Sequence, residues 1–465
     1  MTKRCHVRQI KNTKNMKISV LASLILVFVG LEISAQIVIT NPGRVAERAV
    51  QNRANQKVYQ GVDKGFDKIE EGIGNLFKKK KKEDKPADKQ QKSSEPSDNQ
   101  NDSGHLDGNS IPKEKKPSLQ TYSKFDFMSG EKVIVQEDFS QDEVGDFPDK
   151  WNTNSTGELV MVEGTKGKWL SLSKAGSFMP EFITSLPENF TLEFDLLVNN
   201  EFNFYSSELK VAMASLANPK DFTQWNRFKH EAVIGTEVGF HPTSAGSSSG
   251  RTEFDVFNKT NKSEMHNEVN TSQFFAKQNN FAHVSIWRQK QRLRVYLNEE
   301  KVWDLPRAMD LAVNYNALIF YLHDLHKAED RYLISNLRLA VGAPDTRNKL
   351  ITEGKFVTTG IAFDVNSATI KPESYGTLKT IAQVLQDNAD VRVKIIGHTD
   401  SDGEDNVNMN LSKKRSEAVK SILSSDFGIN ANRLESDGKG ESQPVGENKT
   451  PEGKANNRRV EFVKL

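Results

Sequence analysis

The sequence predicts two folded units of different class, an all-β jelly-roll sandwich followed by an α/β two-layer sandwich. The chain has 465 residues, and a single hydrophobic core rarely grows beyond roughly 250–300 residues. Between residues 132 and 341, short runs of β-branched and aromatic residues are separated by Gly, Asn, Pro and Ser, which is typical of antiparallel strands. From residue 352, strand and helix patterns alternate instead. We therefore expect a β-sandwich over 121–345 and an α/β domain over 350–465.

The amino terminus has the pattern of a secretory signal peptide. Lys11, Lys14 and Lys17 precede an apolar run over residues 18–29, and a small-residue cleavage site ends at Ala35. An uncleaved membrane anchor is the alternative, although a span wants about 20 apolar residues. We expect residues 1–35 to be removed on export, with translation starting at Met1 or Met16.

Composition excludes several classes of protein. The 64 basic and 62 acidic residues leave a net charge of +2, which creates no strong field for nucleic acid. Cys5 is the only cysteine and lies in the segment that we expect to be removed. The exported chain would then have no disulfide and no Cys-ligated metal, so its stability must come from packing.

Two segments connect the signal to the first folded unit. Apolar residues recur at helical spacing within residues 36–77, which predicts an amphipathic helix. Glycines interrupt its apolar stripe, and three roles stay open: docking on its own protein, a coiled coil, or a membrane-surface helix. Residues 78–120 are charged and polar, with almost nothing to bury, and are therefore expected to form a disordered linker.

Period-2 alternation defines the strands of the first folded unit. Leu192, Phe194 and Leu196 alternate with Glu193 and Asp195, which predicts a strand with one buried face and one solvent face. A transmembrane barrel is the alternative fold, although many of the runs are shorter than the roughly 9–11 residues that a barrel strand needs. The expected strands cover residues 133–135, 169–172, 190–198, 209–213, 281–287, 293–297, 317–322 and 333–339.

The order of these segments resembles the concanavalin-like jelly-roll family of lectin and laminin-G type domains. Asp138-Phe139-Ser140, followed by Trp151, resembles the opening of such domains in Bacteroidetes envelope proteins. The runs 294–298, 301–304 and 334–337 resemble their hairpin and final strand. The resemblance implies a ligand-binding sandwich, and the sequence does not name its glycan or protein ligand.

The second unit has the strand and helix order βαβαββ. Expected strands cover residues 356–363, 391–396, 433–438 and 459–463, and expected helices cover 371–386 and 407–424. It contains the motifs Phe363-Asp364 to Ile370, Gly397-His398-Thr399-Asp400, Asn408 to Ser412, Arg415, and Asn456 to Val460. These motifs look like the C-terminal domain of the outer-membrane protein A (OmpA) family, which is shared with peptidoglycan-associated lipoproteins and MotB.

This resemblance implies noncovalent capture of the diaminopimelate side chain of uncrosslinked peptidoglycan. The acid and the arginine of the family fall on Asp400 and Arg415, and its supporting polar positions fall on Asn366, Thr399, Asn408 and Arg458. A free amino acid head presents an ammonium and a carboxylate, so a pocket for it needs one fixed acid and one fork of N–H donors. A turn role for Asp400 and a surface role for Arg415 are the alternatives. No cofactor or metal is implied.

A carbohydrate-active enzyme in the sandwich is the alternative function. Glycoside hydrolysis needs two carboxylates facing across a cleft, and Glu193, Asp195, Glu253 and Asp255 are candidates. Because alternate acids on a strand usually point to solvent, we expect no catalysis. The predicted protein is a non-catalytic envelope protein on the periplasmic side of the outer membrane, with peptidoglycan as its partner. No pattern indicates its oligomeric state.

Overall fold

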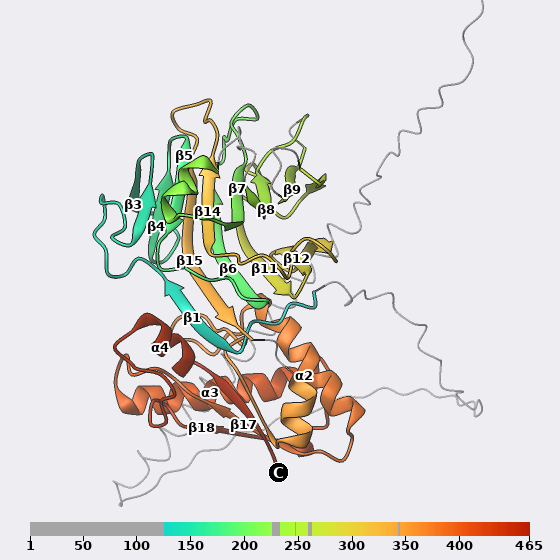
Figure 1. Cartoon of the computed structure of the whole chain (residues 1–465). Helices are drawn as coiled ribbons and strands as arrows, with labels where there is room; N and C mark the ends of the chain where they lie inside the picture. The colour runs from blue at the N-terminus through green and yellow to red at the C-terminus, as the bar shows by residue number, and fades with distance from the viewer. Residues whose placement is uncertain (1–124, 226–232, 247, 259–262, 343–344) are drawn as a thin grey trace, which may run out of the picture. The chain divides into compact units, whose positions relative to one another are not determined.

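A computed structural model describes residues 125–225, 233–246, 248–258, 263–342 and 345–465 (Figure 1). The predicted signal peptide, amphipathic helix and linker, residues 1–120, lie outside the described residues. Among the described residues, no helix has both the length and the apolar character that crossing a membrane requires.

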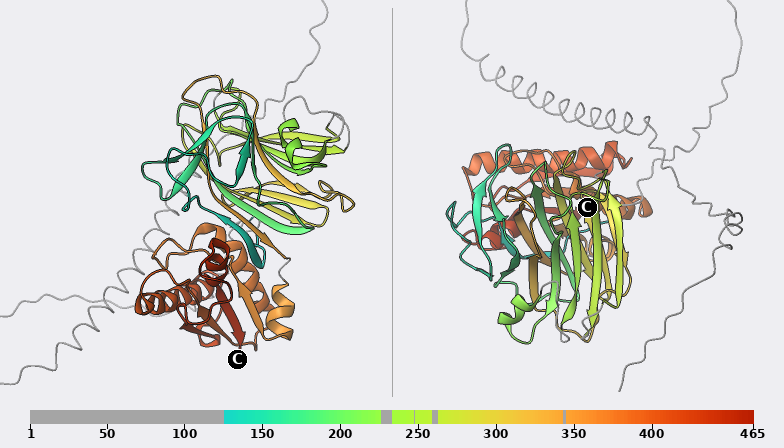
Figure 2. Two further views of the ribbon diagram at one scale, coloured as in Figure 1. Left: turned by 60° about the vertical axis from the view of Figure 1, so that its left-hand side comes forward. Right: turned by 90° about the horizontal axis from the view of Figure 1, so that it is seen from above.

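Residues 132–341 form two antiparallel sheets that lie in separate layers (Figure 2). The first sheet has the order β13-β12-β11-β6-β15-β4-β3, with β1 also paired to β15. Its strands are β1 (Lys132–Glu137), β3 (Gly157–Met161), β4 (Lys168–Leu172), β6 (Asn189–Val198), β11 (Phe281–Gln289), β12 (Arg292–Leu297), β13 (Glu300–Leu305) and β15 (Tyr332–Val341).

The second sheet has the order β10-β9-β8-β7-β14-β5-β2. Its strands are β2 (Trp151–Thr153), β5 (Gly176–Pro180), β7 (Leu209–Ser215), β8 (Ile234–His241), β9 (Gly250–Asn258), β10 (Met265–Thr271) and β14 (Ala317–Leu322), and the short 3-10 helix η1 (Pro219–Gln224) follows β7. The sequence predicted β7 and β14 of this sheet and missed β2, β5, β8, β9 and β10.

The core lies between the two sheets. Leu192, Phe194 and Leu196 of β6 are fully buried in it, as their alternation predicted. The ring of Phe194 meets that of Phe320, on β14 of the second sheet, edge to face at 5.4 Å between centroids. The predicted antiparallel β architecture is confirmed, whereas the jelly-roll connection stays a prediction.

The C-terminal part is a four-stranded sheet with helices, in the order β16-β19-β17-β18, and only β17 and β18 pair in parallel. The strands are β16 (Lys355–Thr358), β17 (Val393–Gly397), β18 (Leu434–Gly438) and β19 (Val460–Lys464). The helices are α2 (Tyr375–Asp387), α3 (Asp405–Ser425) and α4 (Pro451–Asn457), with single turns η2 (Asn348–Thr352), η3 (Pro372–Ser374) and η4 (Ala431–Arg433).

Two expectations for this part were wrong. The strand expected over 356–363 ends at Thr358. The helix α4 stands between β18 and β19, so the order is βαβαβαβ rather than βαβαββ. Thr450 caps this helix, since its side chain accepts from the Gly453 N–H at 3.0 Å, and Pro451 occupies the first turn.

The helix α4 contacts β1 through side-chain hydrogen bonds. The strand β1 pairs only with β15, so its other edge has no strand partner among the described residues. The Asn456 side chain accepts from the Val133 N–H at 3.0 Å and donates to the Val133 carbonyl at 2.9 Å. It therefore satisfies backbone groups on the open edge of the strand, as a neighbouring strand would. Ala455 packs on Val133 and Ala340 beside it.

Candidate functional site

Asp400 lies three residues beyond the end of β17 and is 8% exposed. Its carboxylate accepts a hydrogen bond from the Arg458 guanidinium, which follows α4. The preceding residue fixes the loop, because the Thr399 N–H donates to the Gly440 carbonyl at 3.0 Å. The Asp402 N–H also donates to the Asp400 side chain, at 3.2 Å, so the expected turn chemistry accompanies the ion pair.

Arg415 extends from the middle of α3 and is 8% exposed. Its Nε donates to the Ser367 carbonyl at 3.0 Å, an Nη donates to the Asp364 carbonyl at 3.4 Å, and its guanidinium carbon lies 4.9 Å from the Phe363 ring centroid. Burial and the nearby Arg458 lower the pKa of Arg415 to about 10, against the opposing effect of Asp400.

No carboxylate forms an ion pair with Arg415 among the residues that the structure describes. Its contacts are neutral carbonyls and an aromatic ring, which orient the guanidinium without neutralising it. The expectation that Asp400 and Arg415 lie near one another is supported by their electrostatic coupling. The direct partner of Asp400 is Arg458, which the sequence marked only as a supporting position.

The other predicted positions surround these three side chains. Asn408 on α3 donates to the carbonyls of Asp400 (3.4 Å) and Asp402 (3.1 Å), which ties the loop to the helix. Thr399 is buried, and its hydroxyl has no hydrogen-bond partner among the described residues. Asn366 is exposed and has a left-handed backbone (φ 57°), which asparagine tolerates. That turn carries the two carbonyls that hold Arg415.

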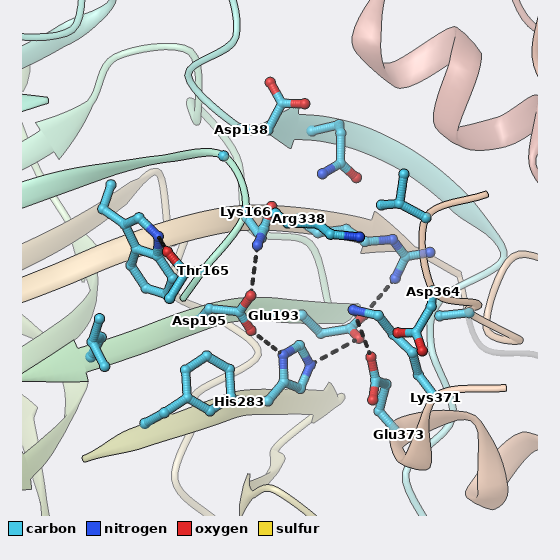
Figure 3. A pocket seen from close by; sticks show the side chains of 18 of the residues that line it. Asp138, Thr165, Lys166, Glu193, Asp195, His283, Arg338, Asp364, Lys371 and Glu373 are labelled. Atoms are coloured by element: carbon cyan, nitrogen blue, oxygen red, sulfur yellow. Dashed lines mark hydrogen bonds and ion pairs between the residues drawn. The ribbon is translucent and has the colours of Figure 1, made fainter. Parts of the chain in front are cut away.

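Arg415 and Arg458 line a cavity of about 1590 Å³ together with residues of the sandwich. On the sandwich side, His283 of β11 lies between two acids of β6, as Figure 3 shows. Its Nδ1 is 2.7 Å from Asp195, and its Nε2 is 3.7 Å from Glu193. Arg338 of β15 also binds Glu193.

The solvent face that was predicted for Glu193 and Asp195 is wrong, because both are less than 10% exposed. Cationic neighbours compensate for this burial. Burial alone would raise the pKa of Glu193. The cations Arg338 and His283 outweigh this effect and lower the pKa of Glu193 to about 2. Burial alone lowers the pKa of His283, and the two acids raise it to about 10. The cluster is therefore two anions and two cations at neutral pH.

The other acids that the enzyme alternative requires lie on the second sheet. The Lys210 ammonium lies 2.6 Å from Glu253, 3.0 Å from Glu237 and 3.3 Å from Asp255. Burial and the charge of Glu208 raise the pKa of Glu253. Within the described ranges, no group of three or more His, Cys, Asp or Glu side chains is arranged to hold a metal ion.

The α/β fold thus holds a buried arginine, Arg415, within the electrostatic influence of the acid Asp400. Residues 362–458 match the OmpA family. This segment is an OmpA family domain, which confirms the resemblance seen in the sequence.

Similar proteins match about a fifth of the chain. "Probable lipoprotein YiaD" of Escherichia coli is 44% identical over 22% of this chain and 47% of its own length. "Outer membrane porin F" of Pseudomonas aeruginosa is 38% identical over 23% and 30%, and "Peptidoglycan-binding protein ArfA" of Mycobacterium bovis is 39% identical over 23% and 33%. The chain thus spans less than half the length of these relatives.

Proposed function

We propose that this protein binds peptidoglycan noncovalently through the diaminopimelate residue of the stem peptide. The observation that carries the proposal is the Arg415 guanidinium, which is buried and oriented but has no carboxylate partner among the described residues. A buried, unneutralised cation is costly unless a ligand supplies the opposite charge. The site is therefore prepared for an anionic group.

The ligand has to present both charges. The carboxylate of the diaminopimelate head binds Arg415, and its ammonium binds Asp400. In the free protein, Arg458 forms an ion pair with Asp400. Because the Arg458 side chain is 43% exposed, it can move aside when the ligand ammonium binds, or it can add a second contact to the ligand carboxylate. Thr399 and Asn408 hold the loop of Asp400, and the turn at Asn366 holds Arg415.

Similar proteins support this proposal and a place in the envelope. The relative from Mycobacterium bovis is named as peptidoglycan-binding, and the relative from Pseudomonas aeruginosa is named as an outer-membrane protein. We propose that the chain is exported to the periplasmic side of the outer membrane, where its OmpA family domain links the sandwich or the membrane to the wall.

We propose a role without catalysis. A glycoside hydrolase needs one protonated carboxylic acid with a raised pKa beside a carboxylate. In the cavity, the pKa values of Glu193 and Asp195 are both lowered, so neither acid can donate a proton near neutral pH. On the second sheet the pKa of Glu253 is raised, but Lys210 binds both Glu253 and Asp255, and neither acid lines the cavity.

Sedimentation with insoluble peptidoglycan tests the proposal. Purified full chain should pellet with the wall, and the Arg415→Ala and Asp400→Asn variants should stay in solution. Arg392→Ala is the matched control, because Arg392 precedes β17 at the end opposite Asp400 and is 54% exposed. Failure of the wild type to pellet, or equal pelleting of all variants, would refute this function.

A further inference from the structure

The cavity beside Arg415 continues along the outer face of the first sheet. Its wall includes Arg415 and Arg458 of the OmpA family domain and Phe281 of the sandwich. Glu193 and His283 of the sandwich also line it, as Figure 3 shows. At about 1590 Å³, it is larger than a small-molecule site, which is typically about 300–1,000 Å³. An amino acid head at Arg415 fills only one end. The remaining volume fits a longer part of the same polymer.

The sandwich wall has a defined order, starting from the C-terminal part. Arg338 binds Glu193 and donates to the Thr359 hydroxyl at 2.8 Å, just beyond β16, so the Glu193 end of β6 lies next to that part. Asp195 and Leu197 follow on the same face of β6, because side chains alternate along a strand. Leu197 is four residues from Glu193, or about 14 Å along the strand.

A charged band comes first along this wall. It consists of Glu193, Asp195, His283 and Arg338, and the Asn336 side chain adds a hydrogen bond to Asp195 at 2.6 Å. Two anions and two cations neutralise one another, so the band offers polar groups without a net charge. It does not favour a second charged group of a ligand.

An apolar band follows beyond it. Trp169, Leu197 and Leu333 form a buried cluster on the outer face of the sheet. Phe281 lies opposite Leu197 in the pairing of β11 with β6, and its ring is 6.4 Å from that of Trp169. Phe281 is 36% exposed and lines the cavity. A partly exposed aromatic ring on an apolar base is a surface for a flat apolar ligand face.

We infer that this apolar band holds the sugar part of a peptidoglycan fragment whose stem peptide is bound at Arg415. The inference rests on the proposed function and adds the ligand's second half. A pyranose ring is uncharged and has an apolar C–H face, which suits Phe281. The hydroxyl and amide groups of the sugars can form hydrogen bonds with the charged band, which has no net charge. The sandwich and the OmpA family domain would then bind one ligand together.

Calorimetric titration of the full chain with three probes tests this inference. The probes are a diaminopimelate-containing stem tripeptide, the same peptide on its N-acetylglucosamine–N-acetylmuramic acid disaccharide, and the disaccharide alone. The sugar-linked peptide should bind about tenfold more tightly than the free peptide, as expected for one stacked apolar face. Phe281→Ala should remove that gain and leave the affinity for the free peptide unchanged, and Phe281→Tyr should retain it.

Phe204→Ala is the control, because Phe204 is equally exposed at 38% but lies outside the cavity wall. Equal affinities of the wild type for the free and the sugar-linked peptide would overturn the inference and leave the proposed function standing. If Phe281→Ala weakened the binding of both peptides equally, the inference would likewise be overturned and the proposed function would stand. Absence of binding by either peptide would overturn the proposed function itself.

Discussion

Replacing His283 with glutamine removes the positive charge between two buried carboxylates. Glutamine keeps a polar side chain of similar size, so the change acts mainly through charge. Asp195, 2.7 Å away in the native protein, loses its cationic partner, and Glu193 keeps only Arg338. The sandwich should therefore become less stable.

The magnitude follows from the pKa of His283, which the two acids raise from 6.5 to about 10 in the folded state. Each pKa unit between the unfolded and the folded state corresponds to about 1.4 kcal/mol of free energy of unfolding. Protonated His283 therefore stabilises the fold by about 4 kcal/mol at pH 7. Removal of one partner from a buried ion pair typically costs about 3–5 kcal/mol, which agrees.

The sign of the pH dependence is fixed by the direction of the shift. Because the folded pKa is raised, the stabilisation is fully present below about pH 6.5 and is lost as pH rises through 10. Urea unfolding followed by tryptophan fluorescence measures it, since all five tryptophans lie in the sandwich region, between residues 151 and 303. The difference between wild type and His283→Gln should be about 4–5 kcal/mol at pH 6 and about 1 kcal/mol at pH 9.5.

His266→Gln is the matched control for this experiment. His266 pairs with Asp255 at 3.0 Å, but its side chain is 51% exposed, so its loss should cost at most about 1 kcal/mol. The reasoning about buried charge would be refuted if both variants lost the same stability. A cost of His283→Gln that stays constant between pH 6 and pH 9.5 would also refute it.

Three further substitutions test other parts of the structure. Lys210→Met leaves three acids of the second sheet without their common cation. Urea unfolding should show that stability falls by about 3–5 kcal/mol. A fall of less than about 1 kcal/mol would contradict a stabilising role of this ion-pair network. Gly397→Ala places a Cβ 2.3 Å from the Ser412 carbonyl, so α3 must shift. Stability should fall by about 1–3 kcal/mol and wall sedimentation should weaken, whereas unchanged sedimentation would show that the position of α3 does not matter. Asn456→Ala removes both hydrogen bonds to Val133 and should lower the stability measured by thermal unfolding by about 1–3 kcal/mol. Asn456→Asp should be intermediate, because it keeps the acceptor. Equal stability of all three proteins would exclude this edge contact.

The sequence predicted the strands whose alternation is strong and missed those in which it is weak. β6 and β14 have continuous apolar or alternating runs. β8 contains two glycines, and β10, with the sequence MHNEVNT, is almost entirely exposed, so neither carries a hydrophobic pattern. Pairing with β9 places them in the sheet, and such pairing leaves no local signal.

The family motif predicted Asp400 and Arg415 as site residues, but it did not show their partners. Arg458 follows Asp400 by 58 residues, and the loop and helix geometry between them decides that they pair. The cluster around His283 depends in the same way on the register of β11 against β6, in which His283 lies opposite Asp195. Alternate acids on β6 therefore looked solvent-exposed, although a histidine and an arginine on neighbouring strands cover them.

In the proposed complex, Arg415 binds the carboxylate of the diaminopimelate head. A stem peptide with lysine in place of diaminopimelate has the ammonium but lacks that carboxylate. Calorimetric titration of the full chain with both peptides therefore isolates the contact. The diaminopimelate peptide should bind at least about tenfold more tightly, since a hydrogen bond to a charged group contributes about 1.5–3 kcal/mol. Arg415→Ala should abolish this preference. Equal affinity of the wild type for the two peptides would contradict the proposed contact.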